Sequence, residues 1–393
     1  MTPDLPSAVF PGAALKGAAL PGAVLRRSPS DFVVDEIPAY APSGRGEHVY
    51  VTFRKTDLTT PEAVKRLARA IDADPRDAGF AGMKDRHAIT TQTASFQVPM
   101  ASDSPSRLAG AALEGIEILS VSRHDNKLKP GHLLGNRFHI VLRDIDPAAI
   151  AAMISALTTI GTTGVPNAFG PQRFGRDGDN PERAIAWLAG KTRGPRDRRE
   201  QRMWFSSLQS LWFNQVLARR ELEGIWSEVL PGDLAKKSET GGMFLVPLEG
   251  PEAEDARARG RSGELSPTGP MFGKKMRWPE GHPAEIEREV LVAALEDPTR
   301  LDAWGNLGEG TRRPLRMPVS DLACEPVASE DASFAALSVR FTLPKGGYAT
   351  TVLGRVAHLT DATISRSNRE QSADPERLAE GDPAPRDEDD GNG

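Results

Sequence analysis

Alternation of apolar and polar residues predicts β-strands in several parts of the chain. The stretches DFVVDEIPAY (31–40) and EHVYVTFRK (47–55) predict two strands joined by the turn APSGRG. The same alternation recurs in TASFQVPM, IEILSVSRH, NRFHIVLRDID, FAALSVRFTLP and GYATTVLGRV. We therefore also expect strands at residues 93–100, 116–124, 136–146, 334–344 and 347–356.

Apolar residues at helical spacing predict five helices. The clearest is TTPEAVKRLARAID (59–72), which opens with a threonine cap and has proline at an early helical position. The other four are predicted at residues 147–161, 180–190, 206–226 and 283–297. Residues 250–280 are rich in glycine and proline, and we predict a loop there.

Strands and helices are mixed without a regular strand–helix repeat, which predicts an α+β fold with a mixed sheet. With 393 residues, the chain is also long enough for two domains. The sequence becomes richer in glycine and then more helical after about residue 165, and strands return after Arg316. We therefore predict a core domain (1–164 and 316–361) interrupted by an inserted domain (165–315), with the two core segments sharing one sheet. The polar, acidic tail (362–393) is predicted to be disordered.

Composition restricts where the protein acts. No apolar run approaches the roughly 20 residues that a membrane-spanning helix needs. The N-terminus lacks the basic and apolar regions of a signal peptide. Cys324 is the only cysteine, which rules out an intrachain disulfide or a zinc site built on several cysteines. We expect a reducing, cytoplasmic location and no membrane partner.

The formal net charge is −5, but the negative charge is concentrated at the C-terminal end of the chain. From Glu370 to Gly393 there are nine acidic residues and two arginines, so the rest of the chain sums to +2. KTRGPRDRREQR (191–202) has six basic residues against two acidic ones. A second cluster contains Arg312, Arg313 and Arg316. Clustered arginines are typical of phosphate contacts with nucleic acid, although solvated surface loops have the same composition.

The stretch AGMKDRHAITTQ (81–92) places Asp85 between Lys84 and Arg86. Neighbouring cations favour the ionised carboxylate, and an ionised carboxylate is able to act as a nucleophile. The alternative is an ordinary polar turn with a structural aspartate. The sequence contains no Walker loop, no dinucleotide-binding glycine pattern, no HExxH and no nucleophile elbow.

Two further polar stretches carry residues suited to RNA. In KLKPGHLLGNRFHIVL (127–142), the Asn136 amide suits a base edge, and the Phe138 ring suits stacking on a base. The alternative for Phe138 is a place in the core of its strand. In GVPNAFGPQRFG (164–175), glycines permit close approach to a ribose-phosphate chain and Arg173 adds a cation. The alternative for this stretch is a hinge between domains with buried phenylalanines.

These motifs together resemble the TruD family of tRNA pseudouridine(13) synthases. The resemblance runs from about residue 24 to about residue 360. It rests on a set of long motifs in the family's order: DFVVDEIP with PSGRGEHVYV, FAGMKDRHAITTQ, KLKPGHLLGNRFHIVLR, GVPNAFGPQRFG, LWFNQVLARR and LPKGGYATTVLGRV. One departure is Ala168, where the family usually has an aromatic residue.

The resemblance implies a pseudouridine-synthase core interrupted by a large α/β insertion, the TRUD domain. It implies that Asp85 is the catalytic aspartate. Arg26, followed directly by Arg27, falls where the family has a basic partner for that aspartate. Asn136 and Phe138 fall at the active-site asparagine and at the ring that stacks on the target base. Lys84 would support the site as a neighbour of Asp85.

The implied reaction isomerises uridine to pseudouridine in tRNA, at position 13, and needs neither a cofactor nor a metal. We expect tRNA as the partner, and a monomeric protein without an obligate protein partner. The predicted phosphate contacts are Arg173, Arg198, Arg199, Arg312 and Arg313. Two alternatives stay open: an RNA-binding protein that keeps the fold without catalysis, and a metal-dependent nuclease with paired carboxylates.

Overall fold

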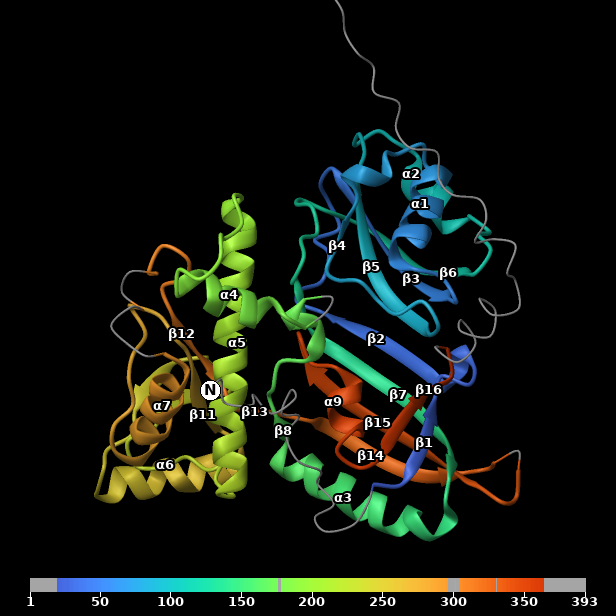
Figure 1. Ribbon diagram of the computed structural model, residues 1–393. Coiled ribbons are helices and arrows are strands. Elements are labelled where there is room, and N and C mark those ends of the chain that lie inside the picture. Colours follow the sequence, from blue (N-terminus) through green and yellow to red (C-terminus); the bar gives the residue numbers. More distant parts are fainter. Residues whose placement is uncertain (1–19, 176–177, 296–300, 302–303, 330, 364–393) are drawn as a thin grey trace, which may run out of the picture.

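The structure is a computed structural model, and it describes residues 20–175, 178–295, 301, 304–329 and 331–363. It has a mixed α+β fold with one large sheet and one smaller sheet, drawn on the right and on the left of Figure 1. The predicted fold class is therefore confirmed. Among the described residues, no helix is long and apolar enough to cross a membrane.

The large sheet has ten strands, and its main path runs in the order β14-β15-β7-β2-β5-β3-β6. Neighbours along this path are antiparallel except β2 and β5, while β1 pairs with β16 in parallel and β4 extends the sheet at β5. Its strands are β1 (Gly22–Leu25), β2 (Phe32–Pro38), β3 (His48–Thr56), β4 (Gly79–Phe80), β5 (Ile89–Gln97), β6 (Ile116–His124), β7 (Leu133–Ile145), β14 (Ser320–Val327), β15 (Ala335–Pro344) and β16 (His358–Asp361). Segments from both ends of the chain thus share one sheet, as predicted.

Strand β7 pairs with β15, β2 and β1, and its apolar residues alternate with polar ones. Phe138, Ile140 and Leu142 lie on one face and are buried in the main core. Gly135 permits the close approach of β7 to β15, since a Cβ there would lie 2.2 Å from the Leu343 carbonyl oxygen. The pattern and this glycine together fix the register around Asn136, which is important for the site.

Four α-helices accompany the large sheet: α1 (Thr60–Ala70), α2 (Ser104–Ala109), α3 (Ile150–Thr163) and α9 (Ala349–Leu353). Thr59 caps α1 in a capping box with Glu62, as the threonine in the sequence predicts. Helix α3 stops at Gly164, whose φ of +72° favours glycine. A side chain at Gly164 would also meet the Met317 carbonyl oxygen at 2.5 Å.

The segment between α3 and β14 forms the smaller sheet, which has the order β10-β9-β11-β12. Its strands are β9 (Leu234–Lys237), β10 (Met243–Leu245), β11 (Leu265–Met271) and β12 (Thr311–Pro314). Its helices are α4 (Asn180–Leu188), α5 (Arg198–Leu222), α6 (Pro251–Ser262) and α7 (Gly281–Ala294). In Figure 1, α5 is the long helix that runs beside this sheet.

Two antiparallel strands join the segment to the large sheet: β8 (Val165–Pro166) and β13 (Arg316–Met317). Arg316 donates hydrogen bonds from this crossing to the Gly260 and Thr162 carbonyl oxygens. A largely buried ion pair between Arg355 and Glu221 adds a second link, at 3.0 Å. The segment is thus tied to the large sheet at several points and is not held by a flexible linker alone.

The prediction of a loop at residues 250–280 is wrong, because this stretch contains α6 and β11. Its glycines and prolines cap the helix: Gly250 precedes it, Pro251 opens it and Gly263 ends it with a φ of +86°. Strand β11 carries prolines in a central position of its sheet, which sequence reasoning normally excludes. All seven residues of β11 are buried, so packing decides its conformation.

The strand predicted at residues 347–356 is also wrong, because the structure has the short helix α9 there. The run Thr350, Thr351 and Val352 favours a strand locally, but Val352, Leu353 and Val356 are all buried in the main core. Tertiary packing therefore overrides local preference. Strands β1, β14 and β16 were not predicted, since they are short or lack a clear alternation.

The predicted domain boundaries at residues 164 and 315 lie close to β8 and β13, and they stay a prediction. The predicted disordered tail (362–393) lies outside the described residues from residue 364 onward.

Candidate active site

Arg26 connects two carboxylates from distant parts of the chain. Its Nη2 lies 3.3 Å from the Asp85 Oδ2 atom, and its Nη1 donates a hydrogen bond to Asp361. The Arg26 and Asp361 side chains are mostly buried, with 15% and 19% of their surface exposed, whereas Asp85 is 53% exposed. Asp85 is therefore held by a cation on one side and open to solvent on the other.

The sheet positions Arg26 through the pairing of β1 with β16. Leu25 is the register partner of Asp361, so the next residue, Arg26, begins beside that carboxylate. Arg26 has a left-handed φ of +56°, a strained conformation for a residue with a side chain. Its guanidinium lies 4.1 Å above the centre of the Phe32 ring, which supports it by a cation–π contact.

The adjacent arginine has a different partner. Arg27 forms an ion pair with Asp144, at the end of β7. Of these two neighbouring arginines, Arg26 is thus the one that contacts Asp85.

Asp361 is kept ionised by its surroundings. Burial alone would raise its pKa, but hydrogen bonds from Thr363 and the charge of Arg26 bring the pKa below its ordinary value. A permanent carboxylate at this position fixes one end of the Arg26 guanidinium. The other end is left to face Asp85.

The sequence predicts that the cations flanking Asp85 hold its carboxylate, but Lys84 does not contact Asp85. Its Nζ forms a buried ion pair with Glu36 of β2 at 2.7 Å, and its backbone NH donates to the Thr60 hydroxyl. Consecutive residues of an extended loop point in different directions, so adjacency in sequence does not bring their charges together. Lys84 instead anchors the loop that carries Asp85 to β2 and α1.

Lys55 holds the same loop from β3. Its side chain is fully buried, and its Nζ donates a 2.6 Å hydrogen bond to the Asp85 backbone carbonyl. Burial lowers the pKa of Lys55 to about 8. Lys55 therefore holds the backbone of Asp85, and Arg26 holds its carboxylate. The ion pair of Lys84 fixes the residue before Asp85.

Asn136 and Phe138 lie on β7, on the same face as the buried residues of that strand. Asn136 is the register partner of Glu36, and its buried Oδ1 has no hydrogen-bond partner among the residues that the structure describes. An unsatisfied buried oxygen is costly and is frequent at functional sites. Phe138 is 6% exposed and stacks on Phe341, with 5.3 Å between ring centres. One face of its ring thus packs in the core, and its role with a base stays a prediction.

The predicted phosphate-binding arginines fall into two groups. Arg198 and Arg199 are exposed in the first turn of α5. Arg173 is also exposed, although its guanidinium donates to the hydroxyls of Ser206 and Ser210 on α5. These three side chains are accessible to a phosphate backbone.

The structure does not support phosphate contacts for Arg312 and Arg313. Arg312 is buried and pairs with both carboxylate oxygens of Glu287 at 2.7 Å. Arg313 donates to Asn167 and lies 4.1 Å above the Phe169 ring, and its burial lowers its pKa. The clustering of arginines in the sequence did not show which guanidinium groups are exposed and which pack against other residues.

The stretch at residues 164–175 lies between the β8–β13 crossing and α5 and contacts both. The Asn167 side chain bridges the Pro314 carbonyl oxygen and Arg313 across the β8–β13 crossing. Asn214 of α5 pairs with both the NH and the carbonyl oxygen of Phe169. This stretch therefore locks α5 to the crossing strands.

Sequence reasoning missed four residues of the site: Lys55, Glu36, Thr60 and Asp361. Only Lys55 carries a usable signal, because it follows Val49, Val51 and Phe53 in the inward phase of β3. A lysine at an inward strand position requires a partner. The others depend on contacts between distant segments.

Comparisons with known proteins agree with this architecture. The family model for tRNA pseudouridine synthase D (TruD) matches residues 17–191 and 196–356. The tRNA pseudouridine synthase D of Anaeromyxobacter sp. (strain Fw109-5) is 44% identical over 338 residues, which cover 84% of this chain and 90% of the relative. The protein of that name from Thermus thermophilus is 39% identical over 333 residues, covering 84% and 88%.

A solved structure shows the same fold. The crystal structure of a TruD protein from Methanosarcina mazei aligns with a TM-score of 0.75 and 23% identity, covering 88% of this chain and 95% of that one. The mixed-sheet α+β fold and the extent of the matches define an RNA-modifying class of enzyme. The chain belongs to the TruD family of tRNA pseudouridine synthases.

Proposed function

We propose that this protein isomerises uridine to pseudouridine in tRNA, at position 13, with Asp85 as the reacting carboxylate and with the target base flipped out of its stack. The observation that carries the proposal is the pairing of Asp85 with Arg26, in which the carboxylate keeps 53% of its surface exposed. The relatives named as tRNA pseudouridine synthases supply the substrate class.

The reaction exchanges one bond of the ribose for another. The bond between uracil N1 and ribose C1′ breaks, the uracil turns, and a bond forms between C5 and C1′. The proton on C5 leaves and N1 ends with a proton, so atoms and electrons balance without oxidation or hydrolysis. Asp85 serves this exchange by attacking the ribose or the base, or by accepting a proton from the ribose.

Arg26 and the loop anchors prepare Asp85 for this role. The Arg26 guanidinium contacts the Asp85 carboxylate and is itself fixed by Asp361. Lys55 and Lys84 hold the loop, so the carboxylate needs little reorganisation during the reaction. The unsatisfied Oδ1 of Asn136 is suited to accept a hydrogen bond from the imide NH of uracil.

Base flipping costs a few kcal/mol, because the target leaves its stack. Phe138 offers an aromatic surface for the released uracil in this proposal, and Arg173, Arg198 and Arg199 offer contacts to phosphates that hold the distorted RNA. We further propose that residues 1–164 and 316–361 form the catalytic domain and that residues 165–315 form the inserted TRUD domain. The protein acts as a monomer in the cytoplasm.

One experiment tests the proposal against its alternatives. Unmodified tRNA is incubated with the pure protein in EDTA, and pseudouridine is mapped along the RNA. Pseudouridine at position 13 is the expected result. Binding without modification would favour an RNA-binding protein, and strand cleavage that appears only with added divalent metal would favour a nuclease.

A further inference from the structure

A cavity of about 350 Å³ lies at the end of α4 and the start of α5, within the segment between α3 and β14. Its lining residues are Trp187, Leu188, Arg198, Gln201, Arg202, Trp304, Asn306 and Leu307. None of them belongs to the large sheet that carries Asp85 and Arg26. The cavity is therefore separate from the candidate active site, and we call it the indole pocket.

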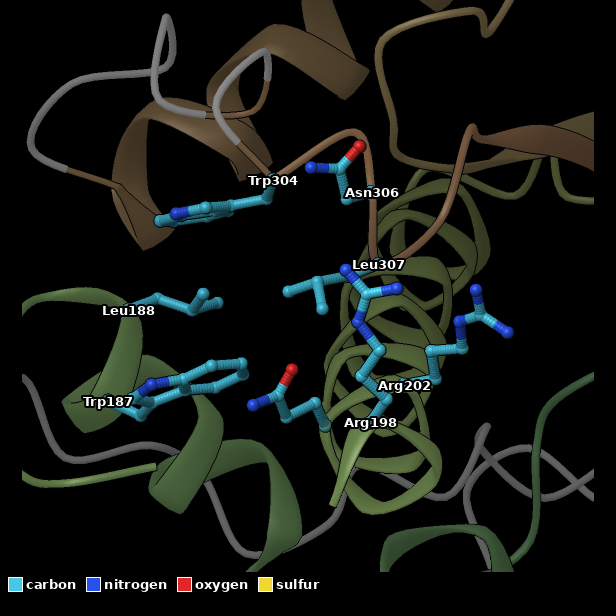
Figure 2. Close-up of a pocket in the computed structure, with 8 residues that line it drawn as sticks. Trp187, Leu188, Arg198, Arg202, Trp304, Asn306 and Leu307 are labelled. Carbon is cyan, nitrogen blue, oxygen red and sulfur yellow. The ribbon is translucent and has the colours of Figure 1, made fainter. Parts of the chain in front are cut away.

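The two indoles face each other across this space. Figure 2 shows Trp304 and Trp187 on opposite sides of the indole pocket. Leu188 and Leu307 lie at heights between the two rings in this view, and Arg198 and Arg202 lie along another side. The volume is at the lower end of the roughly 300–1,000 Å³ typical of small-molecule sites. A single nucleotide is a ligand of that scale.

Both rings are fixed in advance. Trp304 packs edge to face on Phe205, with 6.3 Å between ring centres, and joins the apolar core around Trp212. Trp187 packs edge to face on Trp204 at 6.4 Å. Gly194 covers the Trp187 ring so closely that a Cβ there would lie 2.1 Å from Nε1. Ring surfaces that are already ordered bind with little loss of entropy.

The polar groups of the pocket are suited to a nucleotide, which carries an anionic phosphate and a nucleobase. Among the described residues, the Arg198 and Arg202 guanidinium groups have no hydrogen-bond or ion-pair partner, and both are exposed. The eight lining residues include no carboxylate. Asn306 and Gln201 add side-chain amides, which are able to donate and accept hydrogen bonds at a base edge.

We propose that the indole pocket holds one unpaired nucleotide of the RNA substrate, with its base between Trp187 and Trp304 and its phosphate on Arg198 and Arg202. The inference rests on the proposed function for its ligand class, since it takes RNA as the substrate. Aromatic stacking favours a purine because its larger ring covers more of the indoles. The pocket anchors RNA away from the reacting base, so it affects binding and not the chemical step.

The test compares short oligonucleotides that share the same phosphates. The full chain is titrated with fluorescein-labelled pentaadenylate, and with a pentamer of ribose phosphates that lacks bases, at one salt concentration. We expect the parent protein to bind pentaadenylate about ten-fold more tightly, as stacking of one base predicts. Trp304→Leu keeps apolar packing on Phe205 but removes the ring, and it should abolish this preference without weakening the abasic pentamer.

Two control variants separate the pocket from general effects. Trp278→Leu removes another indole, 39% exposed and outside the pocket, and it should retain the preference. Arg202→Ala should weaken both oligomers, whereas Arg257→Ala, an exposed arginine of α6, should weaken neither. A preference that survives Trp304→Leu, or its absence in the parent protein, would overturn the proposal.

Two further measurements keep the result decisive. Should a melting curve show that Trp304→Leu is unfolded, Asn306→Asp replaces it, because this side chain is exposed. A carboxylate at that position should weaken pentaadenylate about five-fold by repelling phosphate, and unchanged binding would overturn the proposal. Pseudouridine formation in tRNA by the parent protein is measured separately. A parent protein that shows the base preference but forms no pseudouridine would refute the proposed function and not the pocket, whereas a parent protein that forms pseudouridine without the base preference would refute only the pocket.

Discussion

The Arg26 guanidinium lies 3.3 Å from the Asp85 carboxylate. Arg26 directly follows β1, whereas Asp85 lies in the loop between β4 and β5. The contact depends on the parallel pairing of β1 with β16, which brings the last strand of the described chain beside the first. Asp361 completes the arrangement by holding the other side of Arg26. One arginine thereby links the N-terminal strand, the C-terminal strand and the loop before β5.

Asp85→Asn is expected to abolish catalysis with little effect on folding or on tRNA binding. The amide keeps the shape of the side chain but is a poor nucleophile and a very poor base, so each proposed route fails. We expect a loss of at least about 10³-fold in the single-turnover rate, equivalent to roughly 4 kcal/mol. The measurement is pseudouridine formation in unmodified tRNA at saturating enzyme, paired with a binding assay.

A control is available close to Asp85. Asp57 is 54% exposed and contacts His87, so Asp57→Asn removes a similar charge without touching Arg26. This variant should keep most of the rate. Appreciable pseudouridine formation by Asp85→Asn would exclude Asp85 as the reacting group.

Arg26→Ala should slow the reaction less than Asp85→Asn does, because Arg26 orients and polarises the carboxylate without reacting. Loss of a hydrogen bond to a charged group costs roughly 1.5–3 kcal/mol, which corresponds to about 10–150-fold in rate. Arg27→Ala is the matched control, since Arg27 pairs with Asp144. Equal losses in the two variants would show that general charge, and not the contact with Asp85, determines the rate.

The sequence pointed to Asp85, the proposed reacting group, but it did not predict which residues surround Asp85. Asp85 stands out because a local motif contains it, and the strands that carry Asn136 and Phe138 follow from alternation. The cations flanking Asp85 were a misleading signal, since Lys84 turns to Glu36. Asp361 carries no local signal at all, because its position depends on a strand of four residues that pairs with a distant segment.

Variants at Phe138 are expected to distinguish a role of its ring in the core from a role in stacking on the base. Phe138→Ala would leave a cavity beside Phe341 and cost roughly 3–5 kcal/mol of stability, so this variant alone is a poor test. Phe138→Leu keeps apolar volume but removes the ring. We expect it to fold and to lose roughly 1–3 kcal/mol of stacking, about 5–150-fold in rate, while tRNA affinity changes little. Phe138→Tyr should keep most of the activity.

The readout is the single-turnover rate together with a thermal melt for each variant. A folded Phe138→Leu protein with the parent rate would assign the ring to the core only.

Arg198 and Arg199 are expected to contact phosphates of the tRNA. Replacing both with alanine should weaken binding and reduce the slope of log affinity against log salt by roughly 0.7–0.9 per lost contact. Binding is measured across a range of salt concentrations. The double variant Arg257→Ala and Arg261→Ala removes two exposed charges from α6 and should leave the slope unchanged. An unchanged slope in the α5 variant would remove these residues from the interface.

The same arginines show why composition cannot locate an interface. Arg312 and Arg198 both lie in arginine-rich stretches, but Arg312 is enclosed by β11, β12 and α7 and pairs with Glu287, while Arg198 opens an exposed helix. Arg312 is enclosed because β12 pairs with β11 and α7 supplies Glu287. The sequence conceals this pairing, since the prolines of β11 argue against a strand.

Lys55 should make stability depend on pH in a defined window. Its pKa falls from an ordinary value of 10.5 to about 8 because the side chain is buried, and the charges around it only partly offset this effect. The carboxylates of Asp85, Glu62 and Asp57 raise the pKa and provide this offset, whereas the ammonium of Lys84 lowers the pKa further. Between pH 8 and 10.5 the unfolded chain holds a proton on Lys55 that the folded chain has released.

The unfolded state therefore binds more protons in that window, and the contribution of Lys55 to the free energy of unfolding rises with pH. Lys55→Met fills the same space without a titrating group. The difference in unfolding free energy, parent minus variant, should be constant below about pH 8 and should then increase up to about pH 10.5. Denaturant unfolding of both proteins at several pH values measures this difference, and other titrating groups cancel in it. A difference that stays flat across the window would show that Lys55 keeps its proton in the folded protein, held by the Asp85 carbonyl oxygen and the surrounding carboxylates.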